Sequence, residues 1–393
     1  SSSNGLEKYP KLRFPGFDEP YMECRIGDIY SERSQRGADD MELLSVTLND
    51  GVMPRSEIEG KDNSSEDKSN YKVVCKGDMV YNSMRMWQGA NGVSDYDGIV
   101  SPAYTVLMPN KEIDNRYFAS LFKTPNLINE FRKYSQGLTS DTWNLKYPQI
   151  RSIRLYIPSL QEQHKISVFI STLEERIGIQ RQLVDSLKKY KRGLLHEILC
   201  EKIKVTKSVW NVHKIGDYLN SKNIKQLPTP DAPLMAFTAT GGVCDKGERY
   251  DRGFLVKDAS TKLYKRTDLN DFIYSSNNLD VGSIGLNLYG SAVISDVYEI
   301  FSISGADPWF ISEAIQQKSV LHQILKYRQG CLYGQYRIYA EDFLEVSIRV
   351  PPLETQKQIG TIFSRIEYKI KSEQALLDNL ERAKTFFLQQ LFI

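Results

Sequence analysis

The sequence lacks the short patterns that mark nucleotide-dependent and metal-dependent enzymes. It has no G-x-x-x-x-G-K-[ST] phosphate loop and no G-x-G-x-x-G after a predicted strand, which argues against ATP hydrolysis and against a dinucleotide-binding domain. Its four histidines form no H-E-x-x-H pair, and its five cysteines have no C-x-x-C spacing. We therefore expect neither a metal site nor a disulfide framework. These absences predict a binding protein that is not an enzyme and binds no cofactor of its own.

Long hydrophobic runs and a strong excess of one charge are also absent. No apolar stretch approaches the roughly 18 residues of a membrane span, and no signal peptide pattern opens the sequence. We therefore expect a cytoplasmic protein without membrane contact. The net charge over 393 residues is only +2, so any nucleic-acid contact must come from local basic patches. The length predicts two or three domains.

What the sequence does contain is a duplication with a constant offset of 193 residues. Repeats of solenoid proteins are only about 20–50 residues long, so a repeat of this length indicates a duplicated domain. Two similar modules on one chain suggest a protein that reads two similar things at a fixed separation. Among the matching positions, Pro158, Leu160, Gln163 and Ile166 recur as Pro351, Leu353, Gln356 and Ile359.

The repeat predicts an α+β fold with four segments. Residues 10–157 and 205–350 are expected to be β-rich modules, because β-branched and aromatic residues alternate there with Gly, Asn and Asp turns. Residues 158–204 and 351–393 each predict a long amphipathic helix, since apolar residues recur at alternating steps of three and four. Segments that match between the copies are expected to be scaffold, and segments that differ are expected to carry specificity.

The apolar stripe of each predicted helix, which we call the seam, is interrupted by polar residues at two equivalent positions. Such residues destabilise a seam unless they meet a partner. An antiparallel register can set Lys191 against Glu373, and the same register sets Gln180 against Lys384. We predict this register for an antiparallel coiled coil, which could alternatively serve only to join two copies of the chain. It also opposes two apolar pairs, Leu187 to Leu377 and Val184 to Leu380.

The phrases that open the two helices, Ile157–Ile166 and Val350–Ile359, resemble a signature of type I restriction-modification specificity subunits. That signature reads Pro-Pro-Leu-x-x-Gln-x-x-Ile, and the first phrase departs from it with Ser159 in place of the second proline. Leu12–Phe17 and Ile26–Asp28 are also similar to the family's lead-in and first strand. The resemblance covers nearly the whole sequence. It implies two target recognition domains in a pseudo-two-fold repeat, with the two helices as an antiparallel spacer.

The resemblance also implies a function and a set of partners. Each recognition domain would read one half of a bipartite, asymmetric site on double-stranded DNA. Two methyltransferase subunits would dock on the chain and methylate adenine with S-adenosylmethionine. Restriction subunits, which use ATP and Mg, would join to cut unmodified DNA. The alternative is a coiled-coil scaffold that joins proteins without binding DNA.

Polar and basic loops with aromatic residues are the candidates for reading DNA, because Arg or Lys matches guanine and Asn or Gln matches adenine. Each of these loops could also be an ordinary solvated loop. The Gln-Gly phrase kept in both copies could be a structural turn, which makes Arg328, Gln335 and Tyr336 better candidates for specificity. The first-module candidates are Arg33, Gln35, Arg36, Lys68, Asn70, Arg85, Gln88, Gln136, Thr139, Ser140 and Trp143. The second-module candidates are Lys222, Lys225, Lys262, Asn277, Asn278, Arg328, Gln329, Tyr333, Gln335 and Tyr336.

Overall fold

The computed structural model divides into two compact units, each of which contains one β-rich module and parts of both long helices. Unit 1 comprises residues 1–181 and 375–393, and unit 2 comprises residues 182–374. The structure describes residues 9–37, 40–48, 51–60, 64–139, 143–239, 241–245, 262–277, 279, 283–332 and 335–393. No helix in these ranges has the length and hydropathy needed to span a membrane.

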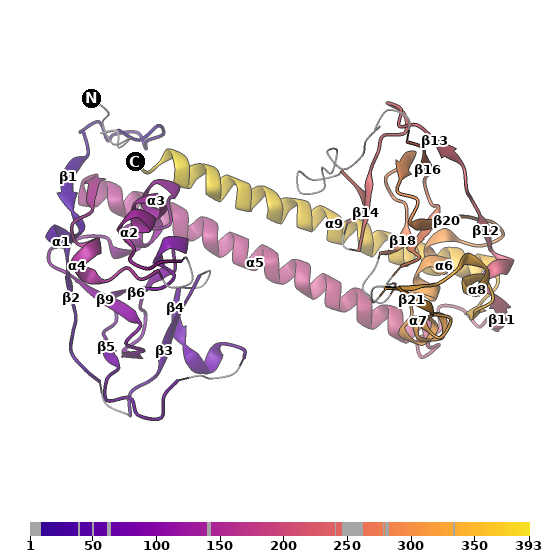
Figure 1. Ribbon diagram of the computed structural model, residues 1–393, viewed down its shortest axis with the longest axis horizontal. Helices are drawn as coiled ribbons and strands as arrows, with labels where there is room; N and C mark the ends of the chain where they lie inside the picture. The colour runs from indigo at the N-terminus through magenta and orange to yellow at the C-terminus, as the bar shows by residue number, and fades with distance from the viewer. Residues whose placement is uncertain are drawn as a thin grey trace. The chain divides into compact units, whose positions relative to one another are not determined.

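Unit 1 combines short antiparallel strands with small helices (Figure 1). Its largest sheet has the strand order β2-β9-β6-β7, and β1 pairs with β10. The strands are β1 (Met22–Arg25), β2 (Tyr30–Glu32), β3 (Leu44–Thr47), β4 (Gly51–Pro54), β5 (Lys72–Val74), β6 (Met79–Asn82), β7 (Asn91–Val93), β8 (Gly98–Val100), β9 (Tyr104–Pro109) and β10 (Arg154–Ile157). The helices are α1 (Ile26–Ile29), α2 (Asn115–Leu121), α3 (Pro125–Tyr134) and α4 (Tyr147–Ile150), with 3₁₀ turns η1 (Arg55–Glu57) and η2 (Met86–Gln88).

Unit 2 repeats this plan. Its largest sheet has the equivalent order β12-β20-β17-β18, and β11 pairs with β23 as β1 does with β10. The strands are β11 (Asn211–Lys214), β12 (Leu219–Ser221), β13 (Lys225–Gln226), β14 (Ala236–Thr238), β15 (Gly242–Cys244), β16 (Tyr264–Thr267), β17 (Phe272–Ser275), β18 (Ile284–Leu286), β19 (Ala292–Ile294), β20 (Tyr298–Ile303), β21 (Gln329–Leu332), β22 (Gln335–Arg337) and β23 (Ser347–Val350). The helices are α6 (Pro308–Ile315), α7 (Lys318–Leu325) and α8 (Ala340–Leu344), with the 3₁₀ turn η3 (Ile215–Asp217).

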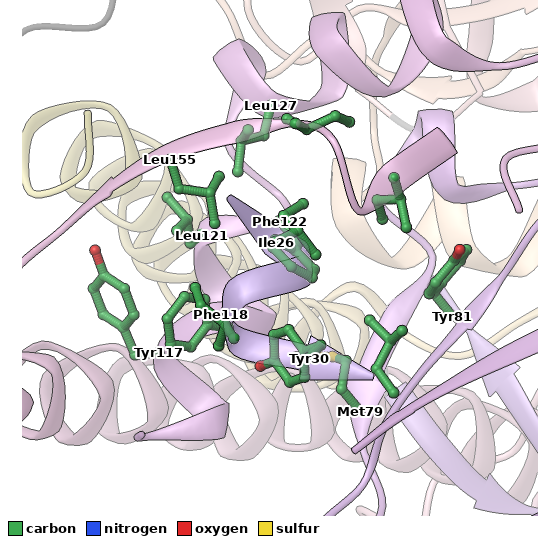
Figure 2. Close-up of a cluster of buried hydrophobic side chains, with 14 of the residues drawn as sticks. Ile26, Tyr30, Met79, Tyr81, Tyr117, Phe118, Leu121, Phe122, Leu127 and Leu155 are labelled. Carbon is green, nitrogen blue, oxygen red and sulfur yellow. The ribbon is translucent and has the colours of Figure 1, made fainter. Parts of the chain in front are cut away.

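The core of unit 1 lies between the large sheet, α2 and α3 (Figure 2). Tyr30, Phe118 and Phe122 are fully buried there, and their rings pack edge-on or tilted at centroid distances of 5.7–6.3 Å. Strand β6 adds Met79 and Tyr81 from one face, as the alternation of a strand requires. Removing one of these phenylalanine rings would cost about 3–5 kcal/mol. The sheet and its helices are thus held together by aromatic rings packed among buried Ile, Leu and Met side chains.

A buried glutamine joins each long helix to its unit. The side-chain oxygen of Gln163 accepts a 3.2 Å hydrogen bond from the backbone of Asp114, and its nitrogen donates 3.0 Å to the carbonyl of Pro158. Gln356 makes the equivalent bonds to Asp307 (3.0 Å) and Pro351 (2.9 Å). The glutamine of the helix-opening phrase therefore fixes the start of the long helix against the N-cap of α2 or α6.

The two long helices, α5 (Leu160–Leu199) and α9 (Leu353–Gln390), pack antiparallel (Figure 1). At about 1.5 Å per residue, each is roughly 60 Å long. Of the eight predicted seam residues, Gln180, Val184 and Leu377 are buried. The others are partly buried: Leu187, Lys191, Glu373, Leu380 and Lys384.

The predicted pairing of the polar seam residues is wrong. Lys191 contacts Glu367 (3.0 Å) instead of Glu373, which bonds Lys369 on its own helix. In unit 1, Lys384 contacts Glu174 (2.6 Å) instead of Gln180. A lysine stem is long enough to carry its ammonium from the seam to a carboxylate at the seam's edge. There the carboxylate keeps part of its hydration, which lowers the cost of burying the pair.

Candidate nucleic-acid interface

A β-hairpin or hairpin-like loop stands at the same place in both units. In unit 1 the backbones of Gln136 and Asn144 exchange hydrogen bonds of 3.0 and 2.8 Å, and Leu145 N–H donates to Ser83 O at 2.8 Å. In unit 2 the pairing of β21 with β22 sets Gln329 opposite Arg337. There Ile338 N–H donates to Ser276 O at 2.9 Å.

Every one of these unit 2 positions lies 193 residues after its unit 1 counterpart. We call this element the frame hairpin; its described residues are 136–139 and 143–145 in unit 1 and 329–332 and 335–338 in unit 2. Both copies thus hold the same backbone element at the end of a central strand.

In unit 1 the frame hairpin carries an aromatic and basic surface. Trp143 packs edge-on against Trp87 of η2, with ring centroids 5.3 Å apart. The guanidinium of Arg132 lies over the Trp87 ring at 5.6 Å. Arg85, which immediately precedes η2, and Gln88, its last residue, are exposed and hydrogen-bonded to each other at 3.5 Å. The structure therefore brings together four predicted DNA-contacting residues: Arg85, Gln88, Gln136 and Trp143.

A second group of predicted residues gathers beside β5. Arg36 bridges to Lys72 of that strand, and its guanidinium donates a 2.6 Å hydrogen bond to the carbonyl of Asn70. The carbonyl of Gln35 accepts from Val73 N–H at 2.9 Å. Gln35, Arg36 and Asn70 are exposed, and Lys68 is half-buried. This edge offers polar side chains on a backbone fixed by strand pairing.

In unit 2 the frame hairpin carries tyrosine and arginine side chains. The Arg328 guanidinium lies 5.5 Å from the ring of Tyr336. Gln329 donates a 2.6 Å hydrogen bond to the carboxylate of Asp342, and Asn277 bridges to Arg337. Four predicted residues are thus close together on one hairpin and the adjoining strand end: Asn277, Arg328, Gln329 and Tyr336.

Two predicted DNA-contacting cations pair with carboxylates of their own unit. Arg33 makes a two-pronged ion pair with buried Asp78 at 2.7 and 3.1 Å, and this hydrogen bonding raises the pKa of Arg33. Lys222 contacts Asp268 (2.6 Å) and Asp271 (2.7 Å). Burial lowers the pKa of Lys222, but its hydrogen bonds to the two carboxylates outweigh this and raise the pKa. Because Asp78 and Asp271 are equivalent in the repeat, we leave both cations out of the proposed interface.

The remaining predicted residues are dispersed or lie outside the described residues. Lys225 pairs with Asp296 at 3.2 Å, Lys262 lies over the Tyr264 ring at 5.4 Å, and Thr139 is exposed. Ser140, Asn278 and Tyr333 fall outside the described residues, as does the side chain of Gln335. Within the described residues, no group of three or more His, Cys, Asp or Glu side chains could hold a metal ion.

Sequence reasoning missed two arginines at this surface. Arg132 was overlooked because it lies on helix α3, outside the loops that the sequence marked, and its role as the cation above Trp87 depends on tertiary packing. Arg337 lies one residue beyond the loop that the sequence marked. A signal for it was present, because the gap-free repeat aligns Arg337 with Asn144 and so marks a position where the two copies differ in charge.

The chain thus has two similar β-rich units, and each carries a polar surface on its own copy of the frame hairpin. This arrangement defines a recognition protein with two similar binding units. The family model for the type I restriction modification DNA specificity domain matches residues 19–189 and 208–382. The chain belongs to this family, and a specificity subunit is the non-catalytic component of a type I restriction-modification system. The resemblance of the helix-opening phrases and the predicted α+β fold class are confirmed.

Individual relatives agree with the family. The putative type I restriction enzyme MjaX specificity subunit of Methanocaldococcus jannaschii is 22% identical over 354 residues, which cover 82% of this chain and 79% of that protein. The type I restriction enzyme HindI specificity subunit of Haemophilus influenzae is 27% identical over 129 residues, covering 31% of this chain and 28% of that protein. The crystal structure of an S subunit from M. genitalium has a TM-score of 0.65 at 14% identity, covering 98% of this chain and 99% of that one. At that identity the likeness shows the fold.

Proposed function

We propose that this chain recognises a bipartite, asymmetric DNA sequence, with one half-site read by each unit. The observation that carries this proposal is the frame hairpin, which has the same backbone bonds in both units but different side chains. Unit 1 offers the Trp87–Trp143 pair, and unit 2 offers Arg328 over Tyr336. Because the backbone of the frame hairpin is alike in both units, we expect both units to dock on DNA in the same orientation. The side chains, which differ, would then distinguish the base edges.

The spacing of the two half-sites would follow from the long helices. Residue pairs along α5 and α9 tie the helices together within each unit, through Arg181–Glu381 (2.8 Å) in unit 1 and Lys191–Glu367 (3.0 Å) in unit 2. A stiff spacer between two reading surfaces translates into a constant number of base pairs between two contacts. We therefore expect a target with a gap of fixed length.

The chemistry would be supplied by partners. We propose that two methyltransferase subunits dock on the chain in the cytoplasm and methylate adenine with S-adenosylmethionine. Restriction subunits that use ATP and Mg would join the same complex. Family membership supports these partners. A structural likeness supports them as well. The chain shares its fold, at a TM-score of 0.50 and 14% identity, with a chain from a structural study of complex assembly and conformational transition of the type I R-M system.

The experiment is to reconstitute the full chain with its methyltransferase subunits and map methylated adenines on genomic DNA. A bipartite motif with a constant gap supports the proposal, together with DNA binding that weakens steeply as salt rises. Methylation without sequence preference would refute it. If no duplex gained affinity even with the partners present, the chain would instead be a coiled-coil scaffold.

A further inference from the structure

Arg337 occupies a backbone position of the frame hairpin in unit 2 that is paired on two sides. On one side it pairs with Gln329 of β21, and on the other it bridges to Asn277 at the end of β17. Backbone pairing on both sides fixes where its side chain begins. That side chain is 48% exposed, so a ligand can reach its guanidinium.

The guanidinium is also oriented by its neighbours. Nη2 donates to Oε1 of Glu299 on β20 at 3.4 Å, and the guanidinium carbon lies 4.9 Å from the ring centre of Tyr339. Glu299 is itself held by Lys265, whose ammonium donates 2.9 Å to Oε2 and 2.8 Å to the carbonyl of Tyr298. Lys265 is buried. A fixed chain of Lys265, Glu299 and Arg337 therefore runs from the core to the surface.

The first copy keeps the lysine but lacks the rest of this chain. The equivalent Lys72 donates to Glu32 on β2 at 3.1 Å and to the carbonyl of Tyr104 at 2.8 Å. Thr105 lies opposite Tyr81, as Glu299 lies opposite Tyr274. Asn144 stands at the position of Arg337. The lysine is common to both units, buried in unit 2 and partly buried in unit 1, whereas Glu299 and Arg337, which it supports, belong to unit 2.

We infer that Arg337 reads a guanine in the half-site of unit 2, with Glu299 as its positioning residue; this rests on the proposed function. Guanine presents two acceptors, O6 and N7, in the major groove, and the planar fork of an arginine matches both. Within the described residues, the Arg337 guanidinium makes one hydrogen bond, through Nη2. Its Nε and Nη1 remain to face a base. Holding the fork in place beforehand reduces the entropy lost on binding.

The test uses the full chain with its methyltransferase subunits and maps methylated adenines across a genome. Arg337→Ala is expected to make one G·C base pair of one half-site degenerate while the other half-site stays unchanged. Discrimination at that base pair should fall about 5- to 150-fold in competition between matched duplexes. Arg337→Lys keeps the charge but loses the fork, so it should relax the same base pair. Glu299→Gln should relax that base pair less. Because it also removes the carboxylate that pairs with buried Lys265, its thermal unfolding temperature should fall, and its base preference is therefore measured well below that temperature.

Lys214→Gln is the matched control, because it removes one positive charge from an exposed ion pair of unit 2 (Lys214–Glu345, 2.6 Å). The complex with Lys214→Gln should methylate the same DNA sequence motif as the wild-type complex. An unchanged motif in Arg337→Ala overturns the inference, as does relaxation in both half-sites. If Arg337→Ala fails to fold, an unchanged base preference in Arg337→Lys overturns it. A wild-type complex without a bipartite motif refutes the proposed function as well, and that failure is recognisable because it appears before any substitution.

Discussion

The ammonium of Lys191 lies 3.0 Å from Oε2 of Glu367, and the equivalent lysine in the other copy, Lys384, lies 2.6 Å from Glu174. Glu174 and Glu367 are themselves equivalent in the repeat. The duplication has therefore kept one ion pair twice, once in each unit, with α5 supplying the lysine in unit 2 and α9 supplying it in unit 1. Lys191 has a further partner, Glu313 at 2.7 Å, where the first copy has Ser120.

Replacing Lys191 by methionine should destabilise unit 2 by about 1–3 kcal/mol, because Glu313 and Glu367 would then face each other without a cation. The free energy of unfolding can be measured by urea titration, with hydrogen exchange reporting on each unit separately. Lys188→Met is the control, since Lys188 is exposed and donates a 3.1 Å hydrogen bond to the neutral amide oxygen of Gln374 on α9. Equal stability of the two variants would show that the pair contributes nothing.

The buried glutamines give a second prediction. Gln356→Leu removes both bonds of its amide and leaves Asp307 N–H and the Pro351 carbonyl without their partner. A buried unsatisfied group costs about 1–3 kcal/mol, so unit 2 should lose roughly 2–4 kcal/mol. Gln358→Leu, two residues further on the exposed face, should change the free energy of unfolding by less than about 0.5 kcal/mol. A similar loss of unfolding free energy in both variants would mean that the hydrogen bonds of the Gln356 amide do not fix the start of α9.

The fold could be predicted largely because the duplication is visible in the sequence. Matching glutamines and matching seam residues marked the start of each long helix and its apolar stripe. The register of the two helices could not be predicted in the same way. Pairing Lys191 with Glu373 assumed that polar seam residues meet one another, whereas a lysine can reach a carboxylate at the edge of the seam.

The candidate interface was only partly predictable, because the sequence does not show which cations are already paired. Arg33 and Arg36 look alike in the sequence. One is held by buried Asp78, and the other is exposed and bonds a backbone carbonyl. Arg337 depends on Glu299, which lies 38 residues away and comes close only when β20 and β22 are in place. Such pairings are tertiary facts, and local residue patterns cannot supply them.

Acid should weaken unit 2 through Asp268. Burial raises the pKa of this carboxyl, but hydrogen bonds from Arg266 and Lys222 outweigh it and hold the pKa well below the ordinary 3.8. A lowered pKa in the folded state stabilises the protein above the unfolded value, and that contribution is lost as the pH falls towards the folded value. Asp268→Asn should therefore destabilise unit 2 by roughly 1–2 kcal/mol at pH 7, after allowance for solvent screening.

The difference between Asp268→Asn and the wild type should shrink as the pH falls below about 4, since the carboxyl of unfolded wild-type chains then takes up a proton while the carboxyl in the folded state is still charged. Urea titrations at several pH values measure this difference in the free energy of unfolding. Asp296→Asn is the control, because its pair with Lys225 is half exposed on both sides. A penalty for Asp268→Asn that stayed constant between pH 7 and pH 3 would contradict the assignment.

Arg33 and Arg36 should separate stability from DNA binding. Arg33→Gln leaves Asp78 buried without its cation, so unit 1 should lose roughly 2–4 kcal/mol. Arg36→Gln should leave the free energy of unfolding unchanged, because Arg36 is exposed. If Arg36 contacts a phosphate, the slope of log affinity against log salt should fall by about one in the complex with methyltransferase subunits. DNA binding measured at several salt concentrations gives this slope. An unchanged slope in Arg36→Gln would show that Arg36 makes no phosphate contact.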